Sequence, residues 1–281
     1  MFSPGLGQLY VGRPGRALVA WVLSSIGGVA LIALASPLRG ITYLAAWAAI
    51  IVASYALPAV DAARIARARR HGSHTAWYNR WYVYAGIIVL AAFTWQPWLR
   101  QWMMANVVES FRIPSGAMDP TIMAGDYIVT KPWRGDILRG DVVVYRRPGD
   151  MQVSRVLGLP GDTIEMRSGV VSIPGRVVDE PYVSLDTADA AYPELAWQGA
   201  HLLPGFERAS YRPSMRSWGP LVVPPDAYFL LSDNRAVSLD SRLLGFVGRG
   251  DIVKRPTVIY FSRDREAGSV RWTRIGRDLR R

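Results

Sequence analysis

Hydrophobic residues gather in three long runs near the start of the chain, at residues 17–36, 41–60 and 81–98. Each run approaches the ~20 apolar residues that a helix needs to cross the hydrocarbon core of a membrane. After residue 104 the pattern changes to short runs of β-branched and aromatic residues separated by Gly, Pro and Asp, which is typical of strands and turns. The pattern predicts three transmembrane helices in a membrane anchor, residues 1–104, and a mainly β domain, residues 105–281.

Arginine distribution predicts how the anchor is oriented. Residues 1–100 contain nine arginines and one acidic residue, Asp61, a net charge of +8. Most of these arginines precede the first run or lie in the connection at residues 61–80, whereas the short loop between the first two runs has only Arg39. Because arginine-rich loops stay in the cytoplasm, we expect a cytoplasmic N-terminus. Three crossings then place the β domain on the export side.

The hydrophobic runs fit a cleaved signal peptide or a soluble helical core less well than a membrane anchor. Residues 17–36 include Ala33-Leu34-Ala35, which resembles a signal-peptide cleavage site, but the run is long and two more runs follow. Buried helices of a soluble protein would also be apolar, although 18–20 residues with almost no charge favour a membrane.

Five short runs after residue 105 are predicted strands because they combine β-forming residues with flanking turn residues. They are residues 126–131, 141–145, 169–173, 228–231 and 257–261. Residues 184–218 show no clear period, and we interpret them as an irregular, extended insertion.

Composition removes several classes of function. The chain has no cysteine, so thiolate nucleophiles and disulfides are excluded, and its three histidines are too scattered to predict a metal site. Residues 101–281 carry 24 basic and 21 acidic residues, a net charge of +3. The overall charge of +11 therefore belongs mostly to the anchor, and we expect neither nucleic-acid binding nor a cofactor or metal.

Five short motifs follow the last hydrophobic run in a fixed order. They are Phe111-Arg-Ile-Pro-Ser-Gly-Ala-Met-Asp-Pro-Thr121, Gly125-Asp126, Gly140-Asp-Val-Val-Val144, Ser154-Arg-Val-Leu-Gly-Leu-Pro-Gly-Asp162, and Ser232-Asp-Asn-Arg-Ala-Val-Ser-Leu-Asp-Ser-Arg242 with Gly245-Phe-Val-Gly248. In this order and spacing, the motifs resemble those of bacterial type I signal peptidases over residues 105–280.

The resemblance implies a signal-peptidase-like two-sheet β domain that lies against the bacterial inner (cytoplasmic) membrane. It also implies a serine peptidase in which a Ser nucleophile and a Lys base remove signal peptides after small residues. The expected partners are signal peptides of exported preproteins and membrane lipid. The β domain would lie on the periplasmic side of a multi-pass protein.

Both catalytic positions implied by the resemblance are substituted. The family nucleophile aligns with Ala117, whose methyl group has no lone pair, and the family lysine aligns with Ser154. The chain contains only two lysines, Lys131 and Lys254, and neither occupies the position of the base. Removing such a pair typically lowers the rate by ~10⁶-fold, so the sequence predicts a catalytically impaired or inactive protein.

The resemblance also assigns roles to residues around these two positions. It places Ser115 at the oxyanion position and five residues around shallow apolar pockets for substrate side chains: Ile113, Pro114, Met118, Ile122 and Val153. It further assigns supporting roles to Asp233, Asn234, Ser238, Asp240 and Arg242. A simpler interpretation is a scaffold turn at 233–234, a buried ion pair between Asp240 and Arg242, and core packing of the apolar residues.

Two functional hypotheses follow. In the first, the chain binds signal peptides without cleaving them, and holds preproteins or regulates an active signal peptidase or a translocase. In the second, it is an active serine endopeptidase with altered catalytic residues, for which Ser115, Ser154 and Ser238 are candidates. A purely structural membrane protein is a weaker third possibility.

Overall fold

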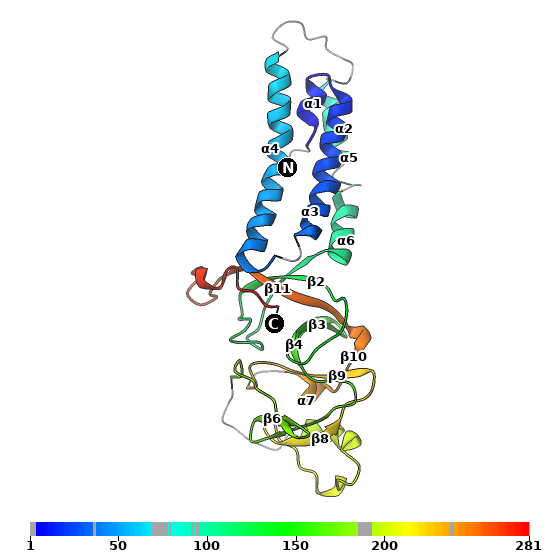
Figure 1. Ribbon diagram of the computed structural model, residues 1–281, viewed down its shortest axis with the longest axis vertical. Helices are drawn as coiled ribbons and strands as arrows, with labels where there is room; N and C mark the ends of the chain where they lie inside the picture. Colours follow the sequence, from blue (N-terminus) through cyan, green and yellow to red (C-terminus); the bar gives the residue numbers. More distant parts are fainter. Residues whose placement is uncertain are drawn as a thin grey trace. The chain divides into compact units, whose positions relative to one another are not determined.

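The computed structural model describes residues 4–35, 38–68, 78, 80–90, 93, 96–184, 193–236 and 239–280. The chain divides into two compact units, Met1–Glu109 and Ser110–Arg281. The first consists of helices and the second mainly of strands (Figure 1).

Two helices of the first unit are long and apolar enough to cross a membrane. The first candidate span, Pro14–Leu31, begins with α2 (Pro14–Val22) and continues through a π-helical turn, η1, and α3. The second lies within α4 (Gly40–Ala68). These apolar helices fit a membrane anchor and largely overlap the runs predicted at 17–36 and 41–60.

The remaining helices of this unit are shorter. They are α1 (Leu6–Tyr10), η1 (Leu23–Gly27), α3 (Gly28–Leu34), α5 (Trp81–Leu90) and α6 (Gln96–Asn106).

The third predicted span is not confirmed. The described residues of this region form α5 and α6, on either side of residues 91–95. Residues 91–92 and 94–95 lie outside the described part of the chain. Two candidate spans are therefore supported, and the third remains a prediction.

Helix α4 extends beyond the second predicted span, residues 41–60, into the arginine-rich connection. Helix α4 continues to Ala68, so Arg64 and Arg67 lie on the helix rather than in a loop. The physical reason is that Ala and Arg are strong helix formers. The apolar run therefore ends before the helix does.

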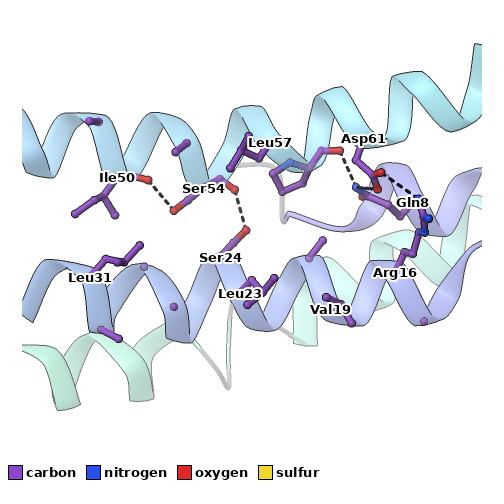
Figure 2. Close-up of a pocket in the computed structure, with 18 residues that line it drawn as sticks. Gln8, Arg16, Val19, Leu23, Ser24, Leu31, Ile50, Ser54, Leu57 and Asp61 are labelled. Carbon is purple, nitrogen blue, oxygen red and sulfur yellow. Dashed lines mark hydrogen bonds and ion pairs between the residues drawn. The ribbon is translucent and has the colours of Figure 1, made fainter. Parts of the chain in front are cut away.

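Pro58 lies inside α4 and removes one hydrogen bond from it. Because proline has no N–H, the carbonyl of Ser54, four residues earlier, loses its usual helical donor. The hydroxyl of Ser24 in η1 donates to that carbonyl at 2.8 Å (Figure 2). The side-chain amide of Gln8 donates to the carbonyl of Pro58 itself at 2.7 Å. The Ser24 hydroxyl thus compensates for the N–H that the proline lacks, as expected in a medium without water.

The second unit contains two β-sheets. The larger sheet has seven strands in the order β1-β2-β11-β3-β4-β9-β10, and the smaller has four in the order β7-β6-β5-β8. The strands of the larger sheet are β1 (Glu109–Arg112), β2 (Asp126–Pro132), β3 (Val142–Arg147), β4 (Asp150–Gly158), β9 (Ala227–Leu231), β10 (Val247–Gly248) and β11 (Ile252–Ser262). Those of the smaller sheet are β5 (Thr163–Arg167), β6 (Val170–Ile173), β7 (Arg176–Val177) and β8 (Trp218–Val222).

One buried cluster joins the two sheets. It combines Leu157 and Phe229 of the larger sheet with Ile164, Met166 and Leu221 of the smaller one. The cluster forms because strand residues alternate between faces, so the apolar side of each sheet can turn toward the other. The predicted mainly β, two-sheet fold is confirmed, and all five predicted strands are present.

Within the predicted irregular insertion, residues 184–218, the structure describes residue 184 and residues 193–218. This part contains a 3₁₀ helix, η4 (Pro193–His201), a second short one, η5 (Arg208–Ser210), and the start of β8. Trp197 and Gln198 of η4 both donate to the carbonyl of Arg242, at 2.8 and 3.0 Å. Hydrogen bonds to the body of the domain therefore hold this segment.

Candidate active site

The segment at residues 113–118 leaves β1 and is held beside β2. The N–H of Ile113 donates to the carbonyl of Asp126 at 2.8 Å, and the N–H of Gly125 donates to the carbonyl of Ile113 at 3.0 Å. Gly125 has a φ of +88°, and a Cβ there would collide with the carbonyl oxygen of Arg263. Glycine is thus required beside the segment. The side chain of Ser115 is exposed, whereas Ala117 is only partly exposed.

The turn at residues 233–234 holds the backbone around Ala117. The N–H of Asn234 donates to the carbonyl of Ala117 at 3.0 Å, and the Asn234 side chain donates to the carbonyl of Gly116 at 3.2 Å. Arg155 of β4 makes two hydrogen bonds to the buried carboxylate of Asp233, at 2.8 and 2.6 Å. One turn therefore binds both the segment that carries Ala117 and the residue next to Ser154.

Val153 and Ser154 point to opposite faces of the large sheet because they are neighbours on one strand. Val153 pairs with Val144 and packs against the cluster that contains Ile113 and Met118. Ser154 pairs with Val143, so its side chain shares a face with Tyr145.

A tyrosine hydroxyl lies next to the side chain of Ser154. Ser154 is 2% exposed, and its Oγ is 3.5 Å from the hydroxyl of Tyr145, which donates to Gln152 at 2.9 Å. Burial raises the pKa of Tyr145, and the hydrogen bond to Ser154 opposes this rise only in part. The phenol therefore stays protonated at neutral pH and cannot act as a base.

The five apolar candidates have different environments. Ile113, Met118 and Ile122 are buried in one core cluster with Ile128, Val142, Ile259 and Leu279. Val153 packs against this cluster but remains partly exposed, and Pro114 is exposed. Core packing thus accounts for three of the five. A contact with substrate side chains remains a prediction for all of them.

Asp240 and Arg242 form a fully buried ion pair at 2.9 Å. The other carboxylate oxygen of Asp240 accepts a hydrogen bond from the N–H of Ser232 at 3.2 Å. The Arg242 guanidinium also donates to the carbonyls of Met215 and Arg235, at 3.0 Å each. The pair therefore links several loops around the site. Ser238 lies outside the described residues.

The two lysines do not lie next to Ser154. Lys254 pairs with Val144 and so shares the face of Val153, opposite to Ser154. Lys131 lies on β2, and β11 and β3 separate that strand from β4. At ~4.8 Å per strand, this separation is about 14 Å. Both amines are thus in the wrong place to accept a proton near Ser154.

No group of His, Asp and Glu side chains that could hold a metal ion occurs among the residues described. The polar groups of the site are instead hydroxyls, amides and guanidinium–carboxylate pairs. Among them, Asn234 and the pair of Arg155 with Asp233 hold the backbone around positions 117 and 154.

A model of one protein family matches residues 79–261, and its description is "Signal peptidase, peptidase S26". The chain belongs to this family. Signal peptidase I P of Bacillus subtilis subsp. natto is 30% identical over 159 residues, which cover 54% of this chain and 76% of that protein. Signal peptidase I of Pseudomonas aeruginosa is 32% identical over 190 residues, which cover 56% of this chain and 66% of that protein. A solved signal peptidase I from Enterococcus faecalis is 28% identical, covers 43% of this chain and 96% of that chain, and gives a TM-score of 0.29.

Membership of the signal peptidase family supports a type I signal peptidase fold and signal peptides as the substrate class of the family. The match spans both Ala117 and Ser154.

Sequence reasoning missed two residues of the site. Arg155 clamps Asp233 and also lies over the ring of Tyr182, with the guanidinium carbon 3.7 Å from the ring centre. An arginine inside an apolar strand is rarely buried without a partner, so the run Val153-Ser-Arg-Val-Leu157 held a usable signal. Tyr145 gave no such signal, because only the pairing of β3 with β4 brings its hydroxyl to Ser154.

Proposed function

We propose that this chain binds signal peptides of exported preproteins and does not cleave them by Ser/Lys chemistry. The single observation that carries this proposal is that Ala117 and Ser154 stand where the motifs of the family lead us to expect the Ser nucleophile and the Lys base. Loss of such a pair typically costs ~10⁶-fold in rate.

The surroundings of Ser154 support the loss of base function. Ser154 offers a buried hydroxyl beside the protonated phenol of Tyr145, and neither group is an amine that could accept the proton of a nucleophile. The exposed Ser115 is two residues from position 117, and the chain bends at Ser115 and Gly116 rather than running straight between the two positions. Misplacement of even ~1 Å can cost ~100-fold in rate.

An unpaired edge of β4 supports peptide binding. β4 pairs with β3 from Asp150 to Arg155, but it pairs with β9 only from Arg155 onward. Within the described residues, the edge of Met151–Ser154 opposite β3 therefore has no strand partner. An extended peptide can add to such an edge through backbone hydrogen bonds. Its small side chains would then face Val153 and the segment at 113–118.

Binding is tested with the purified full chain in detergent and a labelled preprotein. We expect saturable binding to the wild type. Val153→Asp should weaken it at least tenfold, because the introduced carboxylate would place an unpaired charge against an apolar pocket. Tyr260→Asp, a similar charge on a more exposed residue of β11, is the matched control. Binding no stronger than to lipid alone would rule the proposal out.

The double reversion Ala117→Ser with Ser154→Lys tests the catalytic part. We expect the double variant to cleave the preprotein at least 10³-fold faster than the wild type, and each single variant to stay near the background. A wild-type protein that cleaves at a normal rate, with activity removed by Ser115→Ala, would instead support altered catalysis.

We also propose a three-span topology with a cytoplasmic N-terminus and an export-side β domain. Arginine asymmetry supports this orientation. Because the chain has no cysteine, single cysteines report topology directly. In intact cells, a membrane-impermeant maleimide should label Arg176→Cys but not Arg67→Cys. The reverse pattern would place the β domain in the cytoplasm and exclude the proposed topology.

A further inference from the structure

A pocket of about 1000 Å³ lies between the first two candidate spans. Its volume is at the upper end of the ~300–1,000 Å³ range of ligand sites. Small and apolar residues line most of its length, and polar residues gather at one end (Figure 2). The pocket lies wholly within the helical unit, and neither the proposed peptide site nor the substituted catalytic positions take part in it.

The polar end carries one positive and one negative group side by side. Arg16 donates to one carboxylate oxygen of Asp61 at 3.1 Å, and Gln8 donates to the other at 3.3 Å. The side chains of Arg16 and Asp61 remain 61% and 42% exposed, so a ligand can reach both. Asp61 is the only acidic residue in the first hundred, which makes this end electrostatically distinct from the rest of the anchor.

The body of the pocket offers apolar contact rather than polar recognition. Its two serines use their hydroxyl protons inside the protein, Ser24 on the carbonyl of Ser54 and Ser54 on the carbonyl of Ile50 (Figure 2). Val19, Leu23 and Leu31 supply aliphatic surface along the same wall. A long hydrocarbon chain matches such a lining.

We propose that this pocket binds one phospholipid whose headgroup carries a phosphate and a primary ammonium. The phosphate would bind the Arg16 guanidinium, the ammonium would donate to the Asp61 carboxylate, and an acyl chain would fill the apolar body. Charge complementarity favours this ligand, because an anionic headgroup without an amine leaves Asp61 facing negative charge. A quaternary amine has no N–H to donate to the carboxylate. A free phosphate or amine would leave the apolar body unfilled.

Gly27 provides a way to fill the pocket without disturbing its walls. A Cβ at Gly27, which lines the pocket, would meet no atom within 4 Å, and the same is true of Gly86 in α5, which does not line it. Gly27→Phe should therefore occupy the acyl site, and Gly86→Phe is the matched control for adding a large side chain to a membrane helix.

The full chain is reconstituted in nanodiscs of phosphatidylethanolamine and phosphatidylglycerol, released into mild detergent, and examined by native mass spectrometry. The wild type and Gly86→Phe should retain one phosphatidylethanolamine. Retention should fall about tenfold or more in Gly27→Phe, and Asp61→Asn should lose the preference for phosphatidylethanolamine over phosphatidylglycerol. Arg16→Gln should weaken both lipids. The wild type released from nanodiscs made of phosphatidylcholine alone should retain no lipid.

Equal retention of phosphatidylethanolamine by Gly27→Phe and the wild type would overturn the proposal. So would a wild type that retains phosphatidylglycerol or phosphatidylcholine to the same extent as phosphatidylethanolamine. A lipid-free dimer that Gly27→Phe converts to a monomer would assign the pocket to a second copy of the chain. An apolar peptide that displaces the lipid at an equimolar amount would assign it to a protein segment. Either result excludes a resident lipid.

Discussion

Removing the guanidinium of Arg155 should destabilise the β unit more than any exposed charge substitution. Arg155→Met keeps much of the apolar stem but leaves the carboxylate of Asp233, which is 0% exposed, without its ion-pair partner. Breaking a buried pair in this way costs about 3–5 kcal/mol. In a unit of this size each kcal/mol lowers the melting temperature by about 2–4 °C. We therefore expect a loss of about 6–20 °C.

The measurement is thermal unfolding of the purified full chain in detergent, followed by far-UV circular dichroism of the β signal. Arg167→Met is the matched control, because Arg167 forms an ion pair with Glu165 while 75% of its side chain is exposed. Exposed pairs contribute about 0–1 kcal/mol, so its melting temperature should change little.

A double variant tests the mechanism. Arg155→Met with Asp233→Leu removes both charges and should be less destabilised than the sum of the two single changes, because neither charge is left alone. Equal losses in Arg155→Met and Arg167→Met, or strictly additive single changes, would refute the claim that this pair is a buried clamp.

Three further predictions concern other parts of the chain. Burial, aided by the charge of Arg280, lowers the pKa of Lys131 to about 8. The pKa of this lysine in the unfolded chain is the usual value of about 10.5, so between pH 8 and pH 10.5 the unfolded chain binds more protons than the folded one. The free energy of unfolding should therefore rise with pH across that window. Lys131→Met should remove this rise in pH-dependent denaturant melts. Gly125→Ala should be far more destabilising than Gly149→Ala, since both have positive φ but only Gly125 faces a backbone atom; a similar loss of melting temperature in both would contradict this. Ser24→Ala should lower the free energy of unfolding by about 1 kcal/mol in the wild type. The loss should be smaller in the Pro58→Ala background, because the restored N–H at position 58 donates to the carbonyl of Ser54 in place of the Ser24 hydroxyl. An equal loss of unfolding free energy with Pro58 and with Pro58→Ala, measured in a detergent unfolding titration, would exclude that compensation.

The order and type of the main elements could be predicted from the sequence because they depend on local patterns. Long apolar runs predicted the first two spans, and short β-rich runs predicted five strands correctly. The end of α4 was not predicted, because hydrophobicity marks the membrane core whereas helix propensity decides where the helix stops. The third span could not be settled either, since residues 91–92 and 94–95, which lie between α5 and α6, are outside the described part of the chain.

By itself the sequence determined that no lysine stands at position 154 and no hydroxyl at position 117, since these are facts of residue identity. Only the tertiary structure decided what surrounds them. Strand pairing puts the hydroxyl of Tyr145 beside Ser154, and one turn joins Arg155 to the backbone of Ala117. These contacts link residues far apart in the chain, and their existence depends on register and burial, which no local pattern of hydrophobic and polar residues encodes.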